Sequence, residues 1–321
     1  MMMIDDSKIN LHLDDLNKYF DNINVRYFKN NKPISKYFEQ VNCYNCNSKE
    51  ITNTFSHKGF RYVRCKNCGM VYVNPRLKES ITHSNYNDKM YNKFYEIKII
   101  PSIQYRKKLA LNKYNQIVTY FKKPGKVLDI GCGAGEVLSV FKEHKWNCLG
   151  IEFNKYAAFY AKYNFDLKVI NESIYNLKDT SVKFDVILMY GVLEHLYNPK
   201  QILKKVFQLL EQDGILVIEV PSADSLLVSG VECKLVKNVD RIIEGDRHIM
   251  FFSVKSFKQM LNKAGFKVLD IKSNGLDIST INRNCLNEKM SDEHIQFFQN
   301  MLDKSLRGDL LRGFFSKQSE E

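Results

Sequence analysis

The feature that most restricts the fold is a regular alternation of strand and helix patterns after residue 125. Apolar, strand-like runs cover residues 126–130, 147–153, 166–171, 183–191, 214–220 and 267–273, with residues 275–282 as a candidate seventh. Helical patterns separate them at residues 135–145, 155–163, 199–212 and 254–266. Such alternation is typical of a mostly parallel sheet covered on both faces. We therefore expect a doubly wound α/β domain whose ligand lies beyond the carboxyl ends of the strands.

A glycine-rich turn follows the first of these strands in the segment "VLDIGCGAG", residues 127–135. Such a turn usually cradles a phosphate, but Asp129 at the strand end would repel a pyrophosphate. The spacing G-x-G-x-G also differs from the G-x-G-x-x-G of dinucleotide sites. Glu152 ends the next strand, where a carboxylate can accept hydrogen bonds from ribose hydroxyls. The pattern predicts a ligand with an adenosine and positive charges, namely S-adenosylmethionine.

Four of the cysteines form two close pairs, in a C-x2-C-x18-C-x2-C layout. This spacing is typical of a tetrahedral zinc site, and the absence of a signal-like start argues against disulfides. Four thiolates leave no coordination position open for water, so we expect a structural zinc ion rather than a catalytic one. The expected ligands are Cys43, Cys46, Cys65 and Cys68.

Positive charge is concentrated ahead of the glycine-rich turn. The chain has a formal excess of +12, and residues 43–125 hold 16 basic and 4 acidic side chains. This segment is either a solvated surface or a face that attracts an anionic substrate. In the second case we expect Arg61, Arg64 and Arg76 to contact phosphate, because guanidinium groups match its geometry.

No targeting or membrane segment is expected. The start "MMMIDDSKINLHLDD" lacks a basic stretch followed by an apolar one. No later apolar run approaches the roughly 18 residues that a membrane helix needs. We expect a cytoplasmic protein.

The motifs together resemble the class I S-adenosylmethionine-dependent methyltransferases. The resemblance covers about residues 108–283 and is carried by "VLDIGCGAG", "GIEFN", "FDVILMYGVLEHLYNP" and "HIMFFSVKSFKQMLNKAGF". It implies a seven-stranded sheet in which the seventh strand is antiparallel and lies between the fifth and the sixth.

The resemblance also implies a set of cofactor contacts. Asp129 would reach the amino group of the methionine part, and Glu152 would hold the ribose. Glu172 matches an acidic position near the adenine. The expected contacts are Asp129, Gly131, Cys132, Gly133, Gly135, Glu152, Phe153, Glu172, Ser173, Met189 and Tyr190.

The paired cysteines leading into "RYVRCKNCGMVYVNPR" add a narrower resemblance. They are similar to those of bacterial methyltransferases that modify sugars for surface glycans or secondary metabolites. The acceptors of that subgroup differ widely, so the resemblance does not identify the acceptor. Together with the basic segment it leads us to expect O-methylation of an anionic acceptor: a sugar phosphate, a nucleotide-linked sugar or a related surface-glycan precursor. Two alternatives remain open, an RNA methyltransferase whose basic segment binds phosphates and a protein that binds S-adenosylmethionine without turnover.

A hydroxyl acceptor needs a general base, and histidine has the most suitable pKa. His195 in "LEHL" and His248 in "GDRHIMFF" lie in segments that should border the site. For each, a catalytic role and a role in fixing a loop remain alternatives. Glu194 could orient the ring of His195, which favours His195 slightly.

These features predict an N-terminal zinc ribbon ahead of a methyltransferase core. The expected divisions are an N-terminal helical segment (1–42), a zinc ribbon (43–80), a helical connector (81–125), an S-adenosylmethionine-binding core (126–284) and a C-terminal helical tail (285–321).

Overall fold

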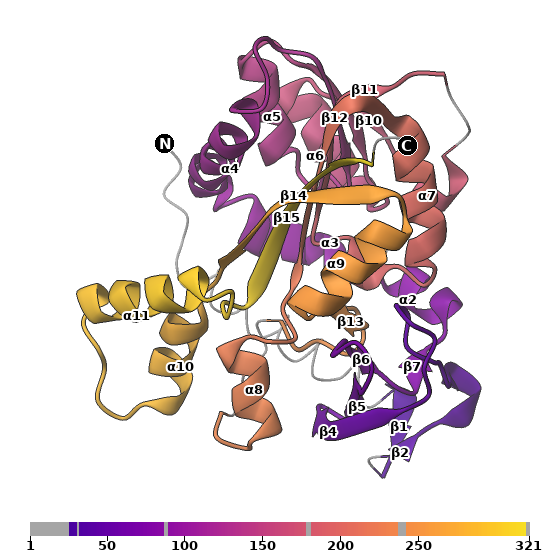
Figure 1. Cartoon of the computed structure of the whole chain (residues 1–321), viewed down its shortest axis with the longest axis vertical. Helices are drawn as coiled ribbons and strands as arrows, with labels where there is room; N and C mark the ends of the chain where they lie inside the picture. Colours follow the sequence, from indigo (N-terminus) through magenta and orange to yellow (C-terminus); the bar gives the residue numbers. More distant parts are fainter. Residues whose placement is uncertain (1–25, 31, 87–88, 178–180, 237–241, 319–321) are drawn as a thin grey trace. The chain divides into compact units, whose positions relative to one another are not determined.

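The structure is a computed structural model that describes residues 26–318, except residue 31 and residues 87–88, 178–180 and 237–241 (Figure 1). Residues 1–25, most of the expected N-terminal helical segment, lie outside the described part. The chain divides into two compact units, Met1–Tyr37 with Lys78–Leu188 and Phe38–Leu77 with Met189–Glu321. Strands from both contribute to a mixed seven-stranded sheet.

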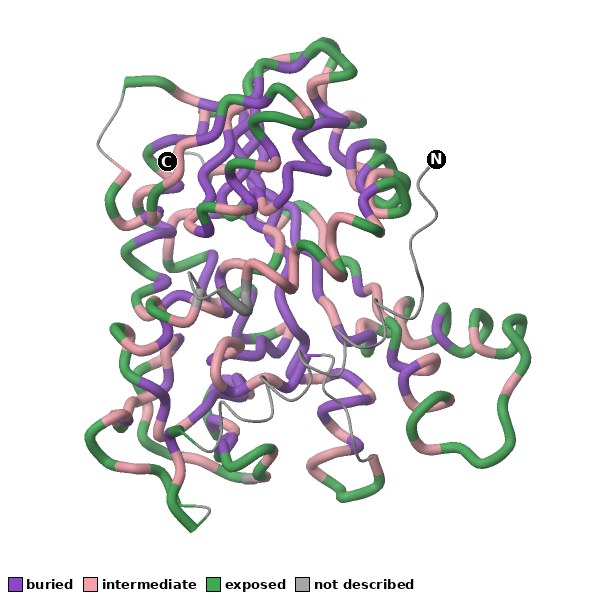
Figure 2. Tube along the Cα trace, turned by 180° about the vertical axis from the view of Figure 1, so that it is seen from behind, coloured by how far each residue is buried: buried purple, intermediate pink, exposed green. Residues whose placement is uncertain are grey.

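The first unit is built on parallel strands in the order β10-β9-β8-β11. Their bounds are β8 (Lys126–Ile130), β9 (Asn147–Ile151), β10 (Lys168–Ile170) and β11 (Phe184–Tyr190). They are linked in part by α5 (Glu136–Glu143), α6 (Lys155–Phe165) and the 3-10 turn η3 (Ile174–Asn176). Four successive residues of β8, from Val127 to Ile130, are buried, as expected for a strand covered on both faces, and Figure 2 shows such strands as continuous buried stretches.

Helices precede this sheet in the chain. They are α2 (Glu79–Tyr86), α3 (Lys89–Phe94), the π-helical turn η2 (Tyr95–Ile99) and α4 (Ile103–Val118). α4 packs on α5, where the rings of Tyr114 and Phe141 meet edge to face at 4.9 Å. The short strands β1 (Phe28–Lys29) and β2 (Lys32–Pro33) and the 3-10 turn η1 (Ser35–Tyr37) take up residues where we expected helix.

The second unit contributes the strands β12 (Leu210–Pro221), β15 (Leu310–Lys317) and β14 (Phe266–Asn274), in that order. β15 is antiparallel to both neighbours, so the expected seventh strand between the fifth and sixth is confirmed. The helical elements are η4 (Leu193–His195), α7 (Pro199–Leu209), α8 (Leu226–Glu232), α9 (Val254–Lys263), α10 (Asp277–Cys285) and α11 (Asp292–Lys304).

Residues 38–77 also belong to the second unit and form the cysteine-containing region. Its strands are β3 (Phe38–Glu39), β4 (Ile51–His57), β5 (Phe60–Cys65), β6 (Val71–Val73) and β7 (Arg76–Leu77). β6 pairs with β13 (Met250–Phe251), giving a four-stranded sheet in the order β13-β6-β5-β4. A strand from the far end of the sequence therefore completes the sheet of this region.

Two sequence-based expectations were wrong at the C-terminal end. Residues 275–282, the candidate seventh strand, begin the helix α10, and the seventh strand is Leu310–Lys317, within the tail expected to be helical. The run "LLRGFF" is short and almost wholly buried between two strands, so it lacks the period-2 pattern of a half-exposed strand. Among the described residues of that tail, 285–318, the helix that agrees with the expectation is α11.

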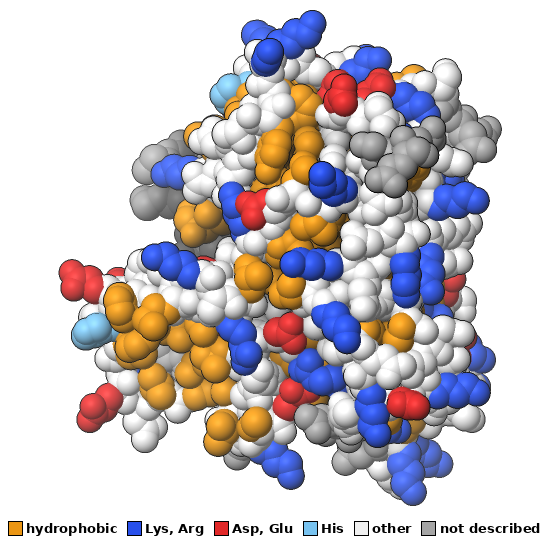
Figure 3. All heavy atoms as spheres, in the orientation of Figure 1, with side chains coloured by type: hydrophobic (Ala, Val, Ile, Leu, Met, Phe, Trp, Pro, Cys, Tyr) orange, Lys and Arg blue, Asp and Glu red, His pale blue; other side chains and the backbone are white. Residues whose placement is uncertain are grey.

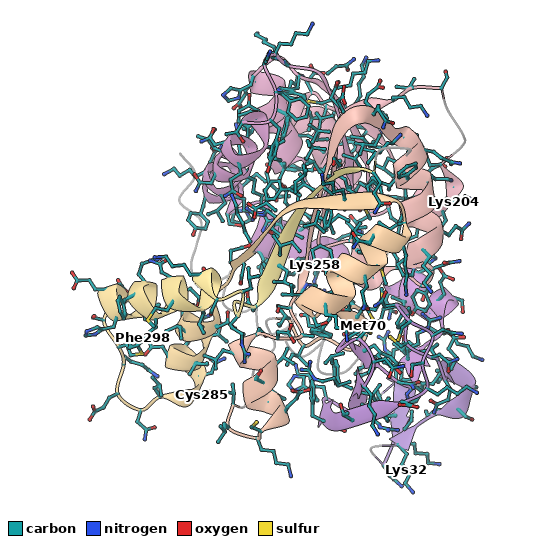
Figure 4. All side chains as sticks on the ribbon, in the orientation of Figure 1. Lys32, Met70, Lys204, Lys258, Cys285 and Phe298 are labelled. Carbon is teal, nitrogen blue, oxygen red and sulfur yellow. The ribbon has the colours of Figure 1, made fainter. Side chains whose placement is uncertain are left out.

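α10 and α11 carry an unusual amount of exposed apolar surface, visible as a group of hydrophobic side chains in Figure 3. Figure 4 marks Phe298 there, and its neighbour Phe297 is 59% exposed. None of the helices in the described ranges is long and apolar enough to cross a membrane.

The buried position of β15 predicts that two phenylalanines of residues 285–321 differ strongly in what their substitution does to stability. Phe314 on β15 is fully buried, so Phe314→Ala should lower the free energy of unfolding by roughly 3 to 5 kcal/mol. Phe297→Ala, on the exposed face of α11, should change it by less than about 0.5 kcal/mol. Urea unfolding of both variants measures this, and equal effects would contradict a central β15.

Candidate active site

The glycine-rich turn in the first unit has the backbone conformation that its sequence requires. Gly131, Gly133 and Gly135 have φ angles of 73°, 55° and 85°, in the left-handed region that favours glycine. A Cβ on Gly135 would lie 2.7 Å from Leu167 Cδ1 and 2.9 Å from Ala161 Cβ. The turn therefore brings its backbone close to α6 and then begins α5.

Glu152, expected to hold the ribose, links the loops at the carboxyl ends of β8 and β9. Its Oε2 accepts a hydrogen bond from the N–H of Gly133 at 2.8 Å, and its Oε1 accepts one from the N–H of Asn154 at 2.6 Å. Burial raises the pKa of Glu152, and these two N–H groups oppose that effect. The side chain of Asn171 donates to the carbonyls of Glu152 and Phe153 at 2.8 and 3.2 Å.

Three buried carboxyl groups surround the turn: Asp129, Glu136 and Glu152. Burial, followed by the negative charge of Glu136, raises the pKa of Asp129 well above its usual range, and Lys113 opposes this. Glu136 Oε2 is buried with no hydrogen-bond partner among the described residues. Three buried acids in one place favour a ligand with positive charge, so the site fits the ammonium and sulfonium of S-adenosylmethionine.

The remaining expected contacts in the first unit differ in their surroundings. Cys132 packs against β9, where its Sγ would lie 2.6 Å from a Cβ on Gly150, and burial raises its pKa well above the usual range. Glu172 is exposed, and Ser173 begins η3 by accepting from Tyr175 N–H at 3.3 Å. Asn171, which carried no recognisable motif, donates to the carbonyls of the loop after β9.

In the second unit, Tyr190 lies next to a buried ion pair. Met189 is fully buried, and the Tyr190 ring lies 5.7 Å from the Arg312 guanidinium. Arg312 Nε donates to Glu219 Oε2 at 2.8 Å, and Arg312 Nη2 contacts the same oxygen. Sequence reasoning missed Glu219 and Arg312, because nothing indicated that β12 and β15 are neighbours.

The structure brings the two expected histidines together. Their ring centroids are 4.9 Å apart, and Glu194 lies in the same group. His195 Nδ1 lies 3.0 Å from the Arg247 carbonyl, and a backbone hydrogen bond at Gly191 also acts on its ring. His248 Nδ1 lies 2.6 Å from the Ile242 carbonyl.

The contacts of these rings distinguish the two histidines. Backbone carbonyls hold the ring of His195, and the expected orienting contact from Glu194 is replaced by the Arg247 carbonyl. His248 Nε2 has no hydrogen-bond partner within the described part of the chain. Desolvation lowers the pKa of His195 to about 3 and that of His248 to about 4, so both rings are neutral at pH 7. An open Nε2 therefore distinguishes His248 from His195, whose ring is held by backbone carbonyls.

The four paired cysteines form one cluster. Cys43 and Cys68 have their Sγ atoms 3.5 Å apart, as do Cys46 and Cys65, and the Cys46–Cys68 separation is 3.8 Å. Zn–S bonds of about 2.3 Å at tetrahedral angles place sulfurs about 3.8 Å apart. Each pair lies on a tight turn, closed by Asn47 N–H to the Cys43 carbonyl and by Gly69 N–H to the Cys65 carbonyl. The cluster therefore has the shape of a four-thiolate metal site.

Two of the three arginines expected to contact phosphate are engaged within the second unit, which corrects that expectation. Arg64 binds both carboxylate oxygens of Glu232 at 3.0 Å and the Ala223 carbonyl at 2.8 Å. Arg76 pairs with Glu39 at 2.9 Å and lies over the Tyr197 ring at 4.2 Å. Arg61 is exposed.

Comparison with known proteins identifies the family of this chain. A family model described as "Methyltransferase domain" matches residues 103–271. An uncharacterised protein of Methanocaldococcus jannaschii is 29% identical over 210 residues, covering 58% of this chain and 80% of its own. The tRNA U34 carboxymethyltransferase of Sulfurovum sp. is 27% identical over 201 residues, covering 60% and 62%.

Among solved structures, the plantazolicin methyltransferase BpumL in complex with SAH shares the fold. It matches with a TM-score of 0.52 and 20% identity, covering 74% of this chain and 94% of BpumL. At that identity the likeness is one of fold. The family match spans more than half of the chain and contains the glycine-rich turn, Asp129 and Glu152. This chain therefore belongs to the methyltransferase-domain family and is an S-adenosylmethionine-dependent methyltransferase.

Proposed function

We propose that this methyltransferase O-methylates a hydroxyl group of a small anionic acceptor, such as a sugar phosphate, a nucleotide-linked sugar or a related surface-glycan precursor. The observation that carries the O-methylation is the neutral His248 ring, whose Nε2 has no partner in the described ranges. The anionic acceptor rests on the positive charge of residues 43–125 and on the paired cysteines ahead of the core.

In this proposal His248 Nε2 accepts the proton of the acceptor hydroxyl. S-adenosylmethionine supplies an electrophilic methyl group with a neutral thioether as its leaving group. The Ile242 carbonyl accepts from His248 Nδ1–H, which fixes the tautomer with a lone pair on Nε2. His195, held by backbone groups, positions the chain around Gly191. Asp129 and Glu152 hold the cofactor in the first unit.

A second candidate acceptor is RNA. One relative is named a tRNA carboxymethyltransferase, and residues 43–125 are strongly basic. Against it, Arg64 and Arg76 are paired with acids, so fewer guanidinium groups are available to phosphates. These pairings favour a small acceptor over RNA, and the experiment below includes tRNA.

The acceptor class is tested by methyl transfer to matched neutral and phosphorylated sugars, nucleotide sugars and tRNA, followed by mass spectrometry. We expect a methyl ether on the anionic small molecules, with an acceptor KM that rises several-fold between about 0.05 and 0.5 M salt, since salt screens exposed charge. His248→Asn should lower kcat by about 10² to 10⁴ while the cofactor's dissociation constant stays unchanged. Methylation of tRNA alone, or equal use of neutral sugars, would refute the proposed acceptor.

The neutral histidines predict a stability that falls in acid. The folded protein keeps both rings neutral down to about pH 4, whereas the unfolded chain protonates them near pH 6.5. Acid therefore favours the unfolded chain. Between pH 6.5 and 5 each histidine should cost up to roughly 2 kcal/mol of unfolding free energy.

The matched variants are His195→Asn and His248→Asn, because an asparagine amide can replace the Nδ1–H donor without titrating. Urea unfolding at pH 7 and pH 5 should give a smaller loss in the double variant than in the wild type. The same loss in both proteins would show that these rings are not held neutral.

We also propose that the cysteine cluster binds one structural zinc ion. Its sulfur separations fit tetrahedral coordination, and all four ligands would be thiolates. In the metal-free form, the hydrogen bond from Cys43 lowers the pKa of Cys68 to about 5, so a thiolate is already favoured there. Metal binding would add to the stability of β4, β5 and β6.

Elemental analysis of purified protein should return about one zinc per chain. Cys43→Ser should lose the metal, because a hydroxyl cannot replace the thiolate, and should unfold more easily. Cys233→Ser, at an exposed cysteine outside the cluster, is the control and should keep the zinc. Metal-free wild-type protein of unchanged stability would rule out a structural role for zinc.

A further inference from the structure

The cofactor site in the first unit has more acids than its ligand can balance alone. Asp129, Glu136 and Glu152 are each at least nine-tenths buried around the glycine-rich turn. S-adenosylmethionine brings an ammonium and a sulfonium, but its methionine part also ends in a carboxylate. Among these acids that carboxylate would be repelled, so it needs a cation or a hydrogen-bond donor of its own.

α4 supplies cations to this site. Arg106 Nε donates to Glu136 Oε1 at 2.7 Å, and Arg106 Nη2 lies 2.5 Å from the same oxygen. The third nitrogen, Nη1, has no partner among the described residues, and the side chain is 40% exposed. Lys113, two turns further along α4, opposes the raised pKa of Asp129. Arg106 is therefore anchored on one side and open on the other.

The turn before α4 adds a hydroxyl. Tyr95, the first residue of the π-helical η2, has its hydroxyl oxygen 3.7 Å from the place a Cβ on Gly133 would take. The preceding helices are tied to the loop after β9: Asn92 accepts from Asn154 Nδ2 at 3.0 Å, and the His83 and Phe153 rings lie 5.4 Å apart. Segments before the sheet thus cover the loops that hold the cofactor, and π-helical turns are frequent at functional sites.

We propose that Arg106 and Tyr95 bind the carboxylate of the methionine part of S-adenosylmethionine, an inference that rests on the methyltransferase activity given above. Arg106 Nη1 offers a charge-assisted hydrogen bond, and the Tyr95 hydroxyl offers a second donor next to Gly133. Glu136 holds the guanidinium in place. The acids then face the cationic groups of the cofactor, while its anionic group faces α4 and η2.

The test uses calorimetry with two ligands, S-adenosylmethionine and its decarboxylated form, which keeps the ammonium and sulfonium but lacks the carboxylate. Arg106→Gln should weaken S-adenosylmethionine binding by roughly ten- to a hundredfold, the scale of a lost hydrogen bond to a charged group. The same variant should leave binding of the decarboxylated form within about twofold, since the group that Arg106 contacts is missing. Tyr95→Phe should show the same selectivity with a smaller loss.

Three controls separate the possible outcomes. Lys108→Gln, at an exposed position on the same helix, should change neither affinity, and Tyr105→Phe is the matched exposed tyrosine. Glu152→Ala should weaken both ligands, because neither lacks the ribose. Equal losses for both ligands in Arg106→Gln would overturn the proposal in favour of a purely structural Arg106. Failure of the wild type to bind either ligand would instead remove the cofactor assignment itself.

Discussion

The Glu152 carboxylate is the contact on which the cofactor site depends. One oxygen accepts from the N–H of Gly133 in the turn after β8, and the other accepts from the N–H of Asn154, which caps α6. A buried carboxylate is costly without such donors, and two backbone N–H groups stabilise its charged form. The residue expected to bind ribose therefore also fixes the shape of the glycine-rich turn.

The cysteine region is held within the second unit by contacts with residues much later in the sequence. β6 pairs with β13, and Ser253 Oγ, the cap of α9, donates to the Cys68 carbonyl at 2.7 Å. Met70, marked in Figure 4, is fully buried beside the second cysteine pair. The bidentate contact of Arg64 with Glu232 adds a link to α8. The region shares its sheet and its buried contacts with residues from the C-terminal half, so a metal there would stabilise this unit as well as its own turns.

Features encoded in a short stretch of sequence could be predicted, whereas contacts between segments far apart in the sequence could not. The alternating patterns, the glycine-rich turn with Asp129 and Glu152, and the cysteine spacing are local, and the structure contains each of them. β15 could not be recognised, because its burial depends on β12 and β14, which lie far away in the sequence. The Glu219–Arg312 pair was missed for the same reason. Arg106 could not be singled out either, because its partner Glu136 lies 30 residues away in the sequence.

The net charge of residues 43–125 overstates the positive charge that a ligand would meet, because several of these bases form ion pairs. The excess of +12 lies wholly in residues 43–125, yet Arg64 and Arg76 are neutralised by Glu232 and Glu39. Arg106 pairs with Glu136, which leaves Arg61 and the lysines of the segment. A lysine ammonium acts as a flexible point charge, whereas an arginine guanidinium is a rigid fork. Such charges raise the local concentration of any anion without selecting its geometry. For the anionic acceptor that we propose, selectivity would then depend on shape and hydrogen bonding rather than on this charge.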